Sequence, residues 1–307
     1  MKPVVTLTVN PAVDVACVTD EVIPMRKVRT RDERYDPGGG GINVARMIRA
    51  LGGEAVAFYL AGGITGQALE GLIDRCGIAS VRVPIAGQTR VSQTVYETST
   101  GHEYRFTPEG PEVTPIECHN CLEVLSIVDG EYFVISGSLP RGMPFDFYAS
   151  VARLAKGHGG RVVLDSSGTA LHRALADGVF LVKPSKRELE HLLGRKASTP
   201  ADEEALAREV VDRGSAEICA LTLGGQGAVL ASRTGVVRLA SPKVESRSAV
   251  GAGDAFLGAM VWALANGRSI DHAFAYGVAA GAATAMSPGT EQGSRDEVER
   301  LFAGLTS

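Results

Sequence analysis

Short apolar runs rich in β-branched residues alternate with helix-like stretches along most of this 307-residue chain. The strand candidates are Val4–Val9, Glu54–Leu60, Tyr132–Ser136, Arg161–Asp165, Val179–Val182 and Ile218–Leu223. Most of these runs are almost continuously apolar, which is typical of parallel strands with helices on both faces. The alternation therefore predicts an α/β fold with a mostly parallel sheet.

Two segments, at about residues 12–35 and 88–107, are more polar and depart from this pattern. In the second one, Val91, Gln93 and Val95 alternate with polar neighbours, as in a strand with one buried face. We expect antiparallel strands with a turn at Ser99–Gly101, forming a small β lid over a single domain of residues 1–307. Such a lid can exclude water from a transfer reaction.

The overall charge argues against some classes of partner. With a formal net charge of -4 and a pI near 5.9, the chain has no basic excess that would attract nucleic acid or an anionic membrane. No apolar run approaches the length of a membrane span, and the N-terminus does not resemble a signal peptide. We therefore expect a cytoplasmic protein.

The five cysteines are an odd number, which fits a reducing compartment better than a disulfide framework. Cys118 and Cys121 form a C-x-x-C motif around His119, but no second pair of ligands completes a zinc site. We expect an incidental or structural role for them, with metal or redox chemistry as the alternative.

The sharpest chemical signal is the stretch VGAGD, residues 250–254, at the start of a helix that is apolar nearly all round. Gly and Ala let backbone N–H groups converge on an anion, and the helix N-terminus adds positive charge. Asp254 could then remove a proton from a hydroxyl while these amides hold a phosphoryl group. The alternative is an ordinary glycine loop with an acid that complements the helix dipole.

A second signal is the run of four glycines that enters a helix in DPGGGGINVAR, residues 36–46. Glycines in such number usually mark a close approach to the main chain, and a sugar is our candidate. Asn43 and Asp14 could hydrogen-bond to its hydroxyl groups. The alternative is a flexible loop with a capping Asn.

Three further motifs follow predicted strands, at the edge of the sheet where α/β proteins bind ligands. They are SGSLP (136–140), KPSKRE (183–188) and LGGQGA (223–228). Lys183 offers a cation, and Glu188 could orient Mg²⁺ through water. The glycines of the third motif, which we read as strand-turn-strand, suit main chain beside a nucleotide, with a plain hairpin turn as the alternative. SGSLP could also be a structural turn, and Glu188 an exposed acid at a helix start.

The lid segments carry basic side chains in a chain that is acidic overall. They are Lys27, Arg29, Arg90 and Arg105. A guanidinium can bind a phosphate through two hydrogen bonds, whereas an ammonium supplies a point charge. Of the four, Arg90 is our first candidate for a phosphate ligand. The alternative is that these residues form a charged exposed edge that discourages aggregation.

Together these motifs resemble the phosphofructokinase-B family of ribokinase-like sugar kinases in order and spacing. The matching stretches are GGGGINVAR (38–46), SGSLP (136–140), DSSG (165–168) and VGAGD (250–254). The resemblance spans essentially the whole chain. It implies a three-layer α/β/α fold with a β lid that often mediates dimerisation, and phosphoryl transfer from ATP to a sugar phosphate with Mg²⁺.

The resemblance also implies a role for each matching residue. Asp254 matches the catalytic base, with Gly251, Ala252 and Gly253 as its anion hole. The positions expected to bind the sugar phosphate are Asp14, Lys27, Arg29, Gly39, Gly40, Asn43, Arg90, Arg105 and Ser138. Those expected on the nucleotide side are Lys183, Ser185, Thr222, Gly224 and Gly227, with Glu188 at the metal.

Two details refine this expectation. The run YDPGGGG with Tyr104–Phe106 looks closest to the minor 6-phosphofructokinase type, because fructose-1-phosphate kinases tend to have a lysine where this chain has Gly40. Fructose 6-phosphate is therefore the expected acceptor. The alternatives are a tagatose-6-phosphate kinase, a 1-phosphofructokinase, a nucleoside or ribose kinase, and a non-catalytic sensor. The family's usual N-x-x-E is S-x-x-E here, so Ser185 has a shorter reach than the usual amide.

Overall fold

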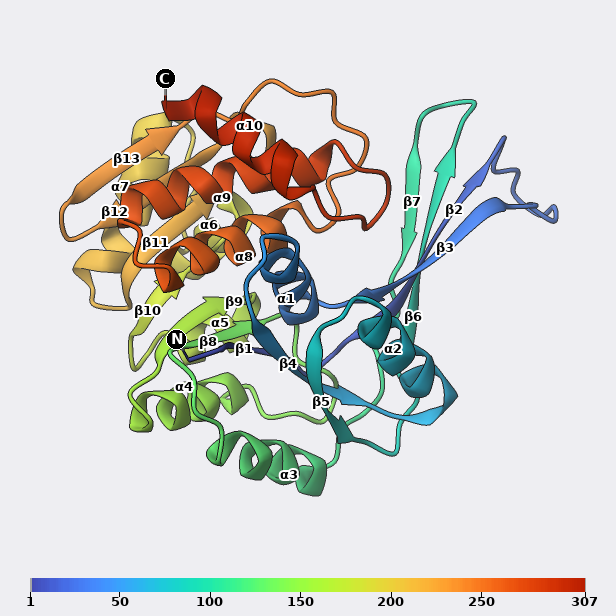
Figure 1. The fold of residues 1–307 in the computed structure, drawn as a ribbon, viewed down its shortest axis with the longest axis horizontal. Helices are drawn as coiled ribbons and strands as arrows, with labels where there is room; N and C mark the ends of the chain where they lie inside the picture. Colours follow the sequence, from blue (N-terminus) through green and yellow to red (C-terminus); the bar gives the residue numbers. More distant parts are fainter. Residues whose placement is uncertain (1, 307) are drawn as a thin grey trace.

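The computed structural model describes residues 2–306, and its larger sheet has nine strands (Figure 1). Their order is β13-β12-β11-β10-β9-β8-β1-β4-β5. The bounds are β1 Val4–Thr8, β4 Ala55–Ala61, β5 Ala79–Pro84, β8 Tyr132–Ser136, β9 Arg161–Asp165, β10 Val179–Val182, β11 Ala216–Thr222, β12 Ala228–Ser232 and β13 Gly235–Leu239. Neighbours from β11 to β5 pair in parallel, whereas β12 and β13 extend the sheet antiparallel.

Helices cover both faces of this sheet. One layer consists of α3 (Pro115–Ser126), α4 (Phe147–Gly157), α5 (Gly168–Ala174), α6 (Lys186–Leu193) and α7 (Pro200–Asp212). The other contains α1 (Gly40–Ala50), α8 (Ala252–Ala265), α9 (Ile270–Ala285) and α10 (Arg295–Thr306), with α2 (Gly63–Arg75) beside α1. The predicted mostly parallel sheet between two helical layers is confirmed. Between residues 2 and 306, no helix is both long and apolar enough to cross a membrane.

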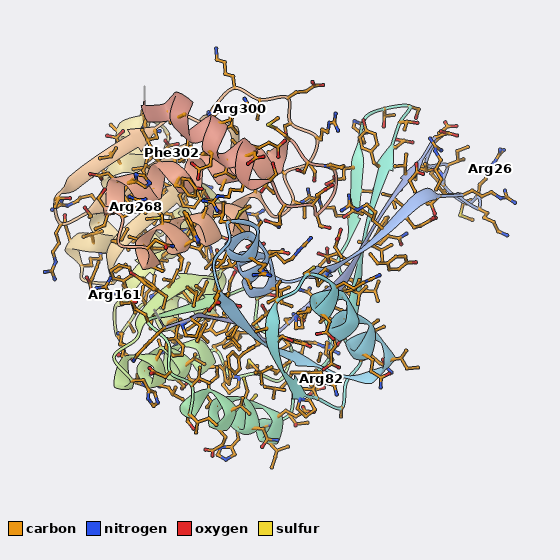
Figure 2. The ribbon with its side chains drawn as sticks, in the orientation of Figure 1. Arg26, Arg82, Arg161, Arg268, Arg300 and Phe302 are labelled. Carbon is orange, nitrogen blue, oxygen red and sulfur yellow. The ribbon has the colours of Figure 1, made fainter. Side chains whose placement is uncertain are left out.

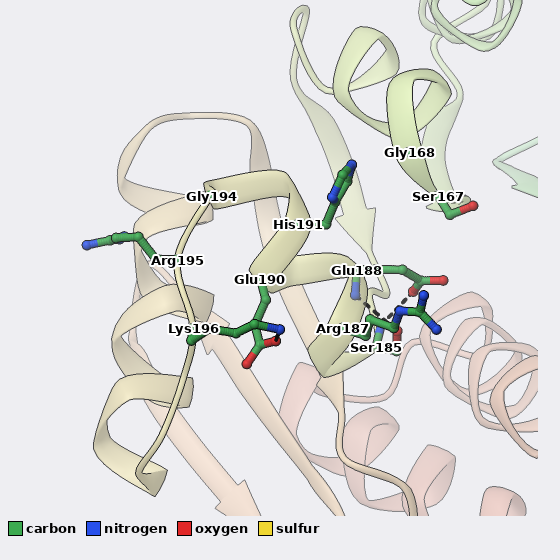
Figure 3. A pocket seen from close by; sticks show the side chains of 10 residues that line it. All are labelled: Ser167, Gly168, Ser185, Arg187, Glu188, Glu190, His191, Gly194, Arg195 and Lys196. Atoms are coloured by element: carbon green, nitrogen blue, oxygen red, sulfur yellow. Dashed lines mark hydrogen bonds and ion pairs between the residues drawn. The ribbon is translucent and has the colours of Figure 1, made fainter.

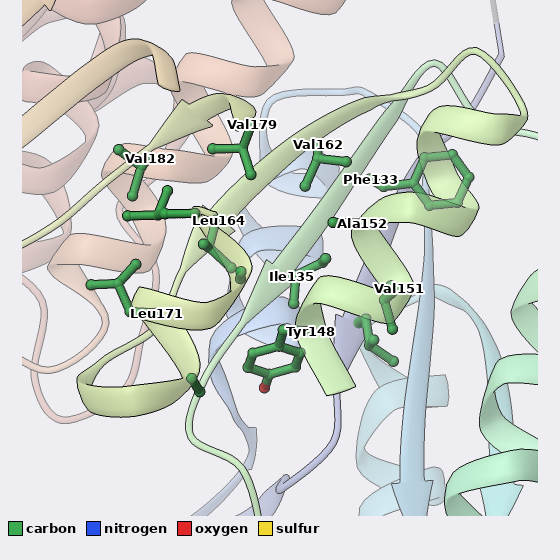
Figure 4. Close-up of a cluster of buried hydrophobic side chains, with 14 of the residues drawn as sticks. Phe133, Ile135, Tyr148, Val151, Ala152, Val162, Leu164, Leu171, Val179 and Val182 are labelled. Atoms are coloured by element: carbon green, nitrogen blue, oxygen red, sulfur yellow. The ribbon is translucent and has the colours of Figure 1, made fainter. Parts of the chain in front are cut away.

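The strands are continuously apolar because both of their faces are buried. Leu164 of β9 and Val182 of β10 belong to the core beneath α3–α7 (Figure 4), while Val163 and Leu181 belong to the core beneath α8–α10. Successive side chains of a strand point to opposite faces, so each strand contributes to both cores. This explains why the pattern was easy to recognise in the sequence.

The smaller sheet projects from the main body (Figure 1) and has the order β3-β2-β6-β7. Its strands are β2 (Ala12–Thr19), β3 (Arg31–Gly38), β6 (Arg90–Glu97) and β7 (Glu103–Phe106). They come from the two polar segments of the sequence, although β2 and β6 pair in parallel rather than antiparallel. The segment between β6 and β7 contains Gly101 at φ +73°, a conformation that favours glycine.

The two faces of this small sheet differ in chemistry. The register pairs Val15 with Tyr35 and Gln93, and Gln93 with Phe106, so these side chains share one mostly apolar face. The opposite face includes the pair Asp14 and Asp36. We call these the apolar face and the polar face.

Several elements were not foreseen from the sequence. The edge strand β5 is half exposed and lacks a continuous apolar run, and α5 is only seven residues long. The helices α3 and α10 and the strand β13 were also not among the expected elements, whereas β12 follows the glycine turn as the strand-turn-strand reading predicts. Strand β10 and helix α6, in contrast, have the expected bounds.

We predict that Leu164→Ala lowers the free energy of unfolding by about 2–5 kcal/mol, because Leu164 is fully buried and the change leaves a cavity. Urea denaturation followed by circular dichroism measures the change. The matched control is Ile127→Ala, at a side chain that is 86% exposed, which should cost less than about 0.5 kcal/mol. Equal losses in the two variants would contradict this description of the core.

Candidate active site

Three polar side chains meet at the carboxyl edge of the large sheet, because their strands are neighbours and parallel. Ser136 ends β8, Asp165 ends β9 and Lys183 follows β10. Lys183 Nζ lies 3.1 Å from Asp165 Oδ1, and Ser136 Oγ donates to Asp165 Oδ2 at 3.5 Å. This buried edge is the floor of the site.

Helix α8 begins above this floor with Gly251 as its N-cap. Gly251 has φ +75°, a left-handed conformation that an L side chain rarely adopts. Gly253 also faces the floor, since a Cβ there would lie 3.4 Å from Lys183 Nζ. The small residues Gly251, Ala252 and Gly253 thus bring main-chain N–H groups and a cation close to one place, as an anion requires.

Asp254 lies in the first turn of α8 and is partly buried, and its Oδ2 accepts a hydrogen bond from Asn43 Nδ2 at 2.9 Å. Burial raises the pKa of Asp254 to about 7, with a further contribution from Asp165, while the Asn43 hydrogen bond and Lys183 act in the opposite direction. A carboxyl group with a pKa near neutrality can both take and return a proton at physiological pH.

Lys183 has a buried side chain among carboxylates. Burial alone would lower its pKa, but Asp165, Asp254 and Glu188 outweigh that effect and raise it. The ammonium therefore keeps its positive charge in the site.

Asp14, Gly39 and Asn43 lie together at the start of α1, where a sugar was expected. A Cβ on Gly38 would collide with the Asp14 carboxylate, and Gly39 has φ +120°. Burial raises the pKa of Asp14 to about 6, although Arg90 and Arg46 partly offset this. The glycine run thus gives Asp14 room beside the main chain.

Arg90 begins β6 and is held by main-chain carbonyls. It donates through one terminal nitrogen to Pro108 O at 2.9 Å and through the other to Asn10 O at 2.8 Å. Its Nε is buried and has no hydrogen-bond partner. Ser138 lies nearby, since its Oγ accepts from Asn10 Nδ2 at 3.4 Å. The guanidinium is fixed next to Asp14, with terminal N–H groups still available.

The other basic residues of the small sheet are not brought to Asp254. Lys27 and Arg29 lie in the segment between β2 and β3, where their neighbour Arg26 marks the far end of the sheet (Figure 2). Arg105 lies on β7, and its Nε donates to Glu103 Oε1 at 2.5 Å. For these three residues, phosphate binding stays a prediction.

A cavity of about 510 Å³ opens beside Ala252 and Gly253, on the side where the nucleotide is expected. The expected residues Thr222, Gly224 and Gly227 line it, together with Ala252 and Gly253. Gly224 begins a short 3-10 helix, and Gly227 has φ +105°.

Other residues also line this cavity. Phe256, Val278, Gly281, Ala282 and Ala285 belong to α8 and α9, the two apolar helices near the C-terminus. The rest form no motif, so only the fold reveals them: Ser241, Pro242, Lys243, Val244, Ser246 and Ala249. The largely apolar character of this lining suits the flat face of a nucleobase.

A second cavity, of about 650 Å³, lies beside α6 and includes Ser185 and Glu188 (Figure 3). The two residues form a capping box, in which Ser185 Oγ accepts from Glu188 N and Glu188 Oε2 accepts from Ser185 N. Ser185 thus caps the helix despite its short reach. Glu188 is close enough to Lys183 and Asp165 to affect their pKa values.

The structure also brings in residues without an expected role. Asp165 belongs to a quoted motif and ends a buried strand, so the signal for it was present. Arg46 and Asp36 lie in the glycine motif but form long-range contacts that no local pattern reveals. Cys118 and Cys121 are buried free thiols on α3, and burial raises the pKa of Cys121 to about 12.

Comparison with protein families places this geometry in context. The family model described as pfkB family carbohydrate kinase matches residues 4–297. The ATP-dependent 6-phosphofructokinase isozyme 2 of Mycobacterium tuberculosis (strain H37Rv) is 43% identical over 304 residues, covering 98% of this chain and 89% of that protein. The protein of that name from Escherichia coli (strain K12) is 38% identical, with both chains covered completely.

A more distant relative has another substrate in its name. The D-tagatose-1-phosphate kinase of Bacillus licheniformis is 32% identical and covers 92% of this chain and 93% of its own.

Solved structures agree with the sequence relatives. Two structures of phosphofructokinase-2 from Escherichia coli, one with fructose-6-phosphate and one described as the tetrameric inhibited form, each have a TM-score of 0.94, 36% identity and full coverage of both chains. A ribokinase from Arabidopsis thaliana, at 19% identity and TM-score 0.77, covers 98% of this chain and 99% of its own and shares the fold. The predicted ribokinase-like architecture is confirmed.

We predict that Gly40→Ala reduces turnover in the expected kinase reaction by roughly 10²-fold, the loss typical of a misplaced reacting group. A Cβ at Gly40 would overlap Ser136 Oγ and lie 3.3 Å from Asp254 Oδ1, so it would fill the space in front of the carboxylate. Steady-state kinetics measures the loss. Gly71→Ala is the control, since a Cβ there has nothing within 4 Å. Unchanged turnover in Gly40→Ala would mean that the acceptor does not lie in this space.

Proposed function

The chain belongs to the pfkB family of carbohydrate kinases, and on this basis we propose that it transfers the γ-phosphoryl group of ATP to fructose 6-phosphate and produces fructose 1,6-bisphosphate. That it is an ATP-dependent sugar-phosphate kinase follows from the family and from relatives named as phosphofructokinases. The choice of acceptor is supported by those relatives. The observation that carries the mechanism is the position of Asp254 between the glycine run of α1 and the nucleotide-side cavity.

In this mechanism Asp254 takes the proton of the acceptor hydroxyl as that oxygen attacks the γ-phosphorus of ATP, and the bond from this phosphorus to the bridging oxygen breaks to release ADP. The N–H groups of Gly251–Gly253 and the Lys183 ammonium stabilise the charge on the transferring group. Asp14, Gly39 and Asn43 hold the sugar, and the small sheet excludes water. Arg90 would bind the sugar's own phosphate through terminal N–H groups that its bonds to Pro108 O and Asn10 O leave free.

Mg²⁺ fits the donor groups of this site, although they would not hold the ion alone. Between residues 2 and 306, no cluster of three or more His, Cys, Asp or Glu side chains could ligate a metal. Mg²⁺ commonly uses one or two carboxylates, several waters and the substrate phosphates, so Glu188 suits contact through water. The bound ion would neutralise charge on the phosphates.

The apolar face of the small sheet supports a homodimer formed through that sheet. Tyr35 is 57%, Phe106 58% and Val91 40% exposed, and the register places all three on this face. Clustered exposed apolar side chains usually mark an interface, and a second copy of the chain is the partner we propose.

We predict that Phe106→Asp converts the dimer to a monomer, because it places a charge on the apolar face. Sedimentation equilibrium gives the mass directly. Ile116→Asp, at a side chain that is 67% exposed on α3, is the control and should leave the mass unchanged. A Phe106→Asp protein that keeps the wild-type dimer mass would exclude this interface.

Two further proposals concern the whole chain. We propose that residues 1–307 form a single kinase domain. Met1 and Ser307 lie outside the described residues. All five cysteines are free thiols, which supports a reducing compartment such as the cytoplasm.

The proposed reaction is tested by ATP consumption with Mg²⁺ and a panel of acceptors: fructose 6-phosphate, tagatose 6-phosphate, fructose 1-phosphate, fructose and ribose. We expect the highest kcat/KM with fructose 6-phosphate, and tagatose 6-phosphate as the nearest competitor because it differs at one hydroxyl. Preference for fructose 1-phosphate would instead place the chain with the 1-phosphofructokinases. Preference for an unphosphorylated sugar would overturn the role of Arg90.

A further inference from the structure

A chain of hydrogen bonds leads from Asp254 to the small sheet. Asn43 donates through Nδ2 to Asp254 Oδ2 at 2.9 Å, and its own Oδ1 accepts from a terminal nitrogen of Arg46 at 3.2 Å. The other terminal nitrogen of Arg46 lies 3.4 Å from Oδ1 of Asp36, which belongs to β3. The Arg46 side chain is only 9% exposed, so water competes little for these bonds.

At its outer end the chain reaches the segment between α9 and α10. Thr290 Oγ1 donates to Asp36 Oδ2 at 2.6 Å. Arg34 lies 3.6 Å from the same Asp36 oxygen and pairs with Glu291 at 2.7 Å. These contacts join residues more than 250 positions apart in the sequence and hold the small sheet against the main body.

The order of donors along this chain determines the orientation of the Asn43 amide. An arginine can only donate, so Arg46 binds the amide oxygen and leaves the amide nitrogen facing Asp254. If the amide turned over, two oxygens would face each other. A donor beside a carboxylate favours its ionised form, which is the form that can accept a proton from a hydroxyl.

We propose that Arg46 is a positioning residue that links docking of the small sheet to the readiness of Asp254 to act as a base. While Asp36 holds the guanidinium, Asn43 presents its N–H to the carboxylate. When the small sheet moves away, Arg46 loses this partner and Asn43 is free to turn. The inference rests on the proposed function, because it assumes that Asp254 is the base.

Other charged groups also face Asp254 and must be separated from this effect. Asp165 on β9 and Asp14 on β2 raise its pKa, whereas Lys183 after β10 lowers it. Arg46 lowers the pKa of Asp14, and it is linked by hydrogen bonds to Asp254 through Asn43. The role proposed for Arg46 therefore runs through Asn43.

The test is the pH dependence of kcat at saturating substrates in Arg46→Met, which keeps the side-chain stem but removes all donors. We expect the midpoint of the acidic rise in kcat to move up by about one pH unit. At pH values below this midpoint kcat should be about tenfold lower than in the wild type, and it should recover at alkaline pH. The KM for ATP should stay within about twofold of the wild-type value, since Arg46 does not line the nucleotide cavity. Arg46→Lys, which retains a donor, should restore most of the wild-type profile.

Asp36→Asn separates the proposed link from simple electrostatics. The negative charge of Asp36 raises the pKa of Asp14. If Asp36 acted only through its charge, removing that charge would shift the pH profile of kcat to lower pH. We expect a shift to higher pH, smaller than in Arg46→Met. Arg49→Met, at an exposed position one turn further along α1, is the matched control and should leave the profile unchanged.

Two results would overturn the proposal: a loss in Arg46→Met that is equal at every pH, and a shift to lower pH in Asp36→Asn. The first would indicate a structural role, and the second a direct charge effect. Infrared titration measures the pKa of the Asp254 carboxyl directly and needs no turnover. The signal of this carboxyl is the difference between the spectra of each protein and of its Asp254→Asn form, and its pKa should show the same shift. Failure of the proposed function would therefore leave this test valid.

Discussion

The partly buried carboxylate of Asp254 is the constraint on which the rest of the site depends. A carboxylate removed from water is costly unless its partners replace the lost hydration. Here one amide hydrogen bond and one ammonium favour the ionised form, while burial and the carboxylates of Asp165 and Asp14 oppose it. The balance leaves the pKa near neutrality, which a group that must accept and release a proton requires.

The fold produces this balance by placing three separate parts of the chain together. Parallel strands bring Asp165 and Lys183 to one edge, and α8 presents its N-terminus above that edge. The glycine run of α1 then leaves space in front of the carboxylate, where a side chain on Gly40 would intrude. The small sheet completes the site with Asp14 and Arg90, and its docking contacts reach Asp254 through Asn43 and Arg46.

Much of the fold could be predicted because buried strands and the two apolar C-terminal helices have strong local signals. Asp254, Asn43 and Lys183 could be singled out for the same reason, since each lies in a motif next to such an element. The role of Arg46 could not be predicted, because it depends on Thr290 and Asp36 lying side by side. Val244 lacks any motif and meets Val278 of α9 only in the folded cavity. For Lys27 the sequence indicated charge but not its place at the far end of the small sheet.

The central claim, that Asp254 is the catalytic base, is tested most directly by the chemical step itself in Asp254→Asn. A single-turnover experiment, in which enzyme–ATP complex is mixed with fructose 6-phosphate and quenched rapidly, separates phosphoryl transfer from product release. We expect the rate constant to fall roughly 10²- to 10⁴-fold, because the amide keeps the shape of the side chain but cannot accept the proton. A rate constant within a few-fold of the wild-type value would contradict the account and require another base.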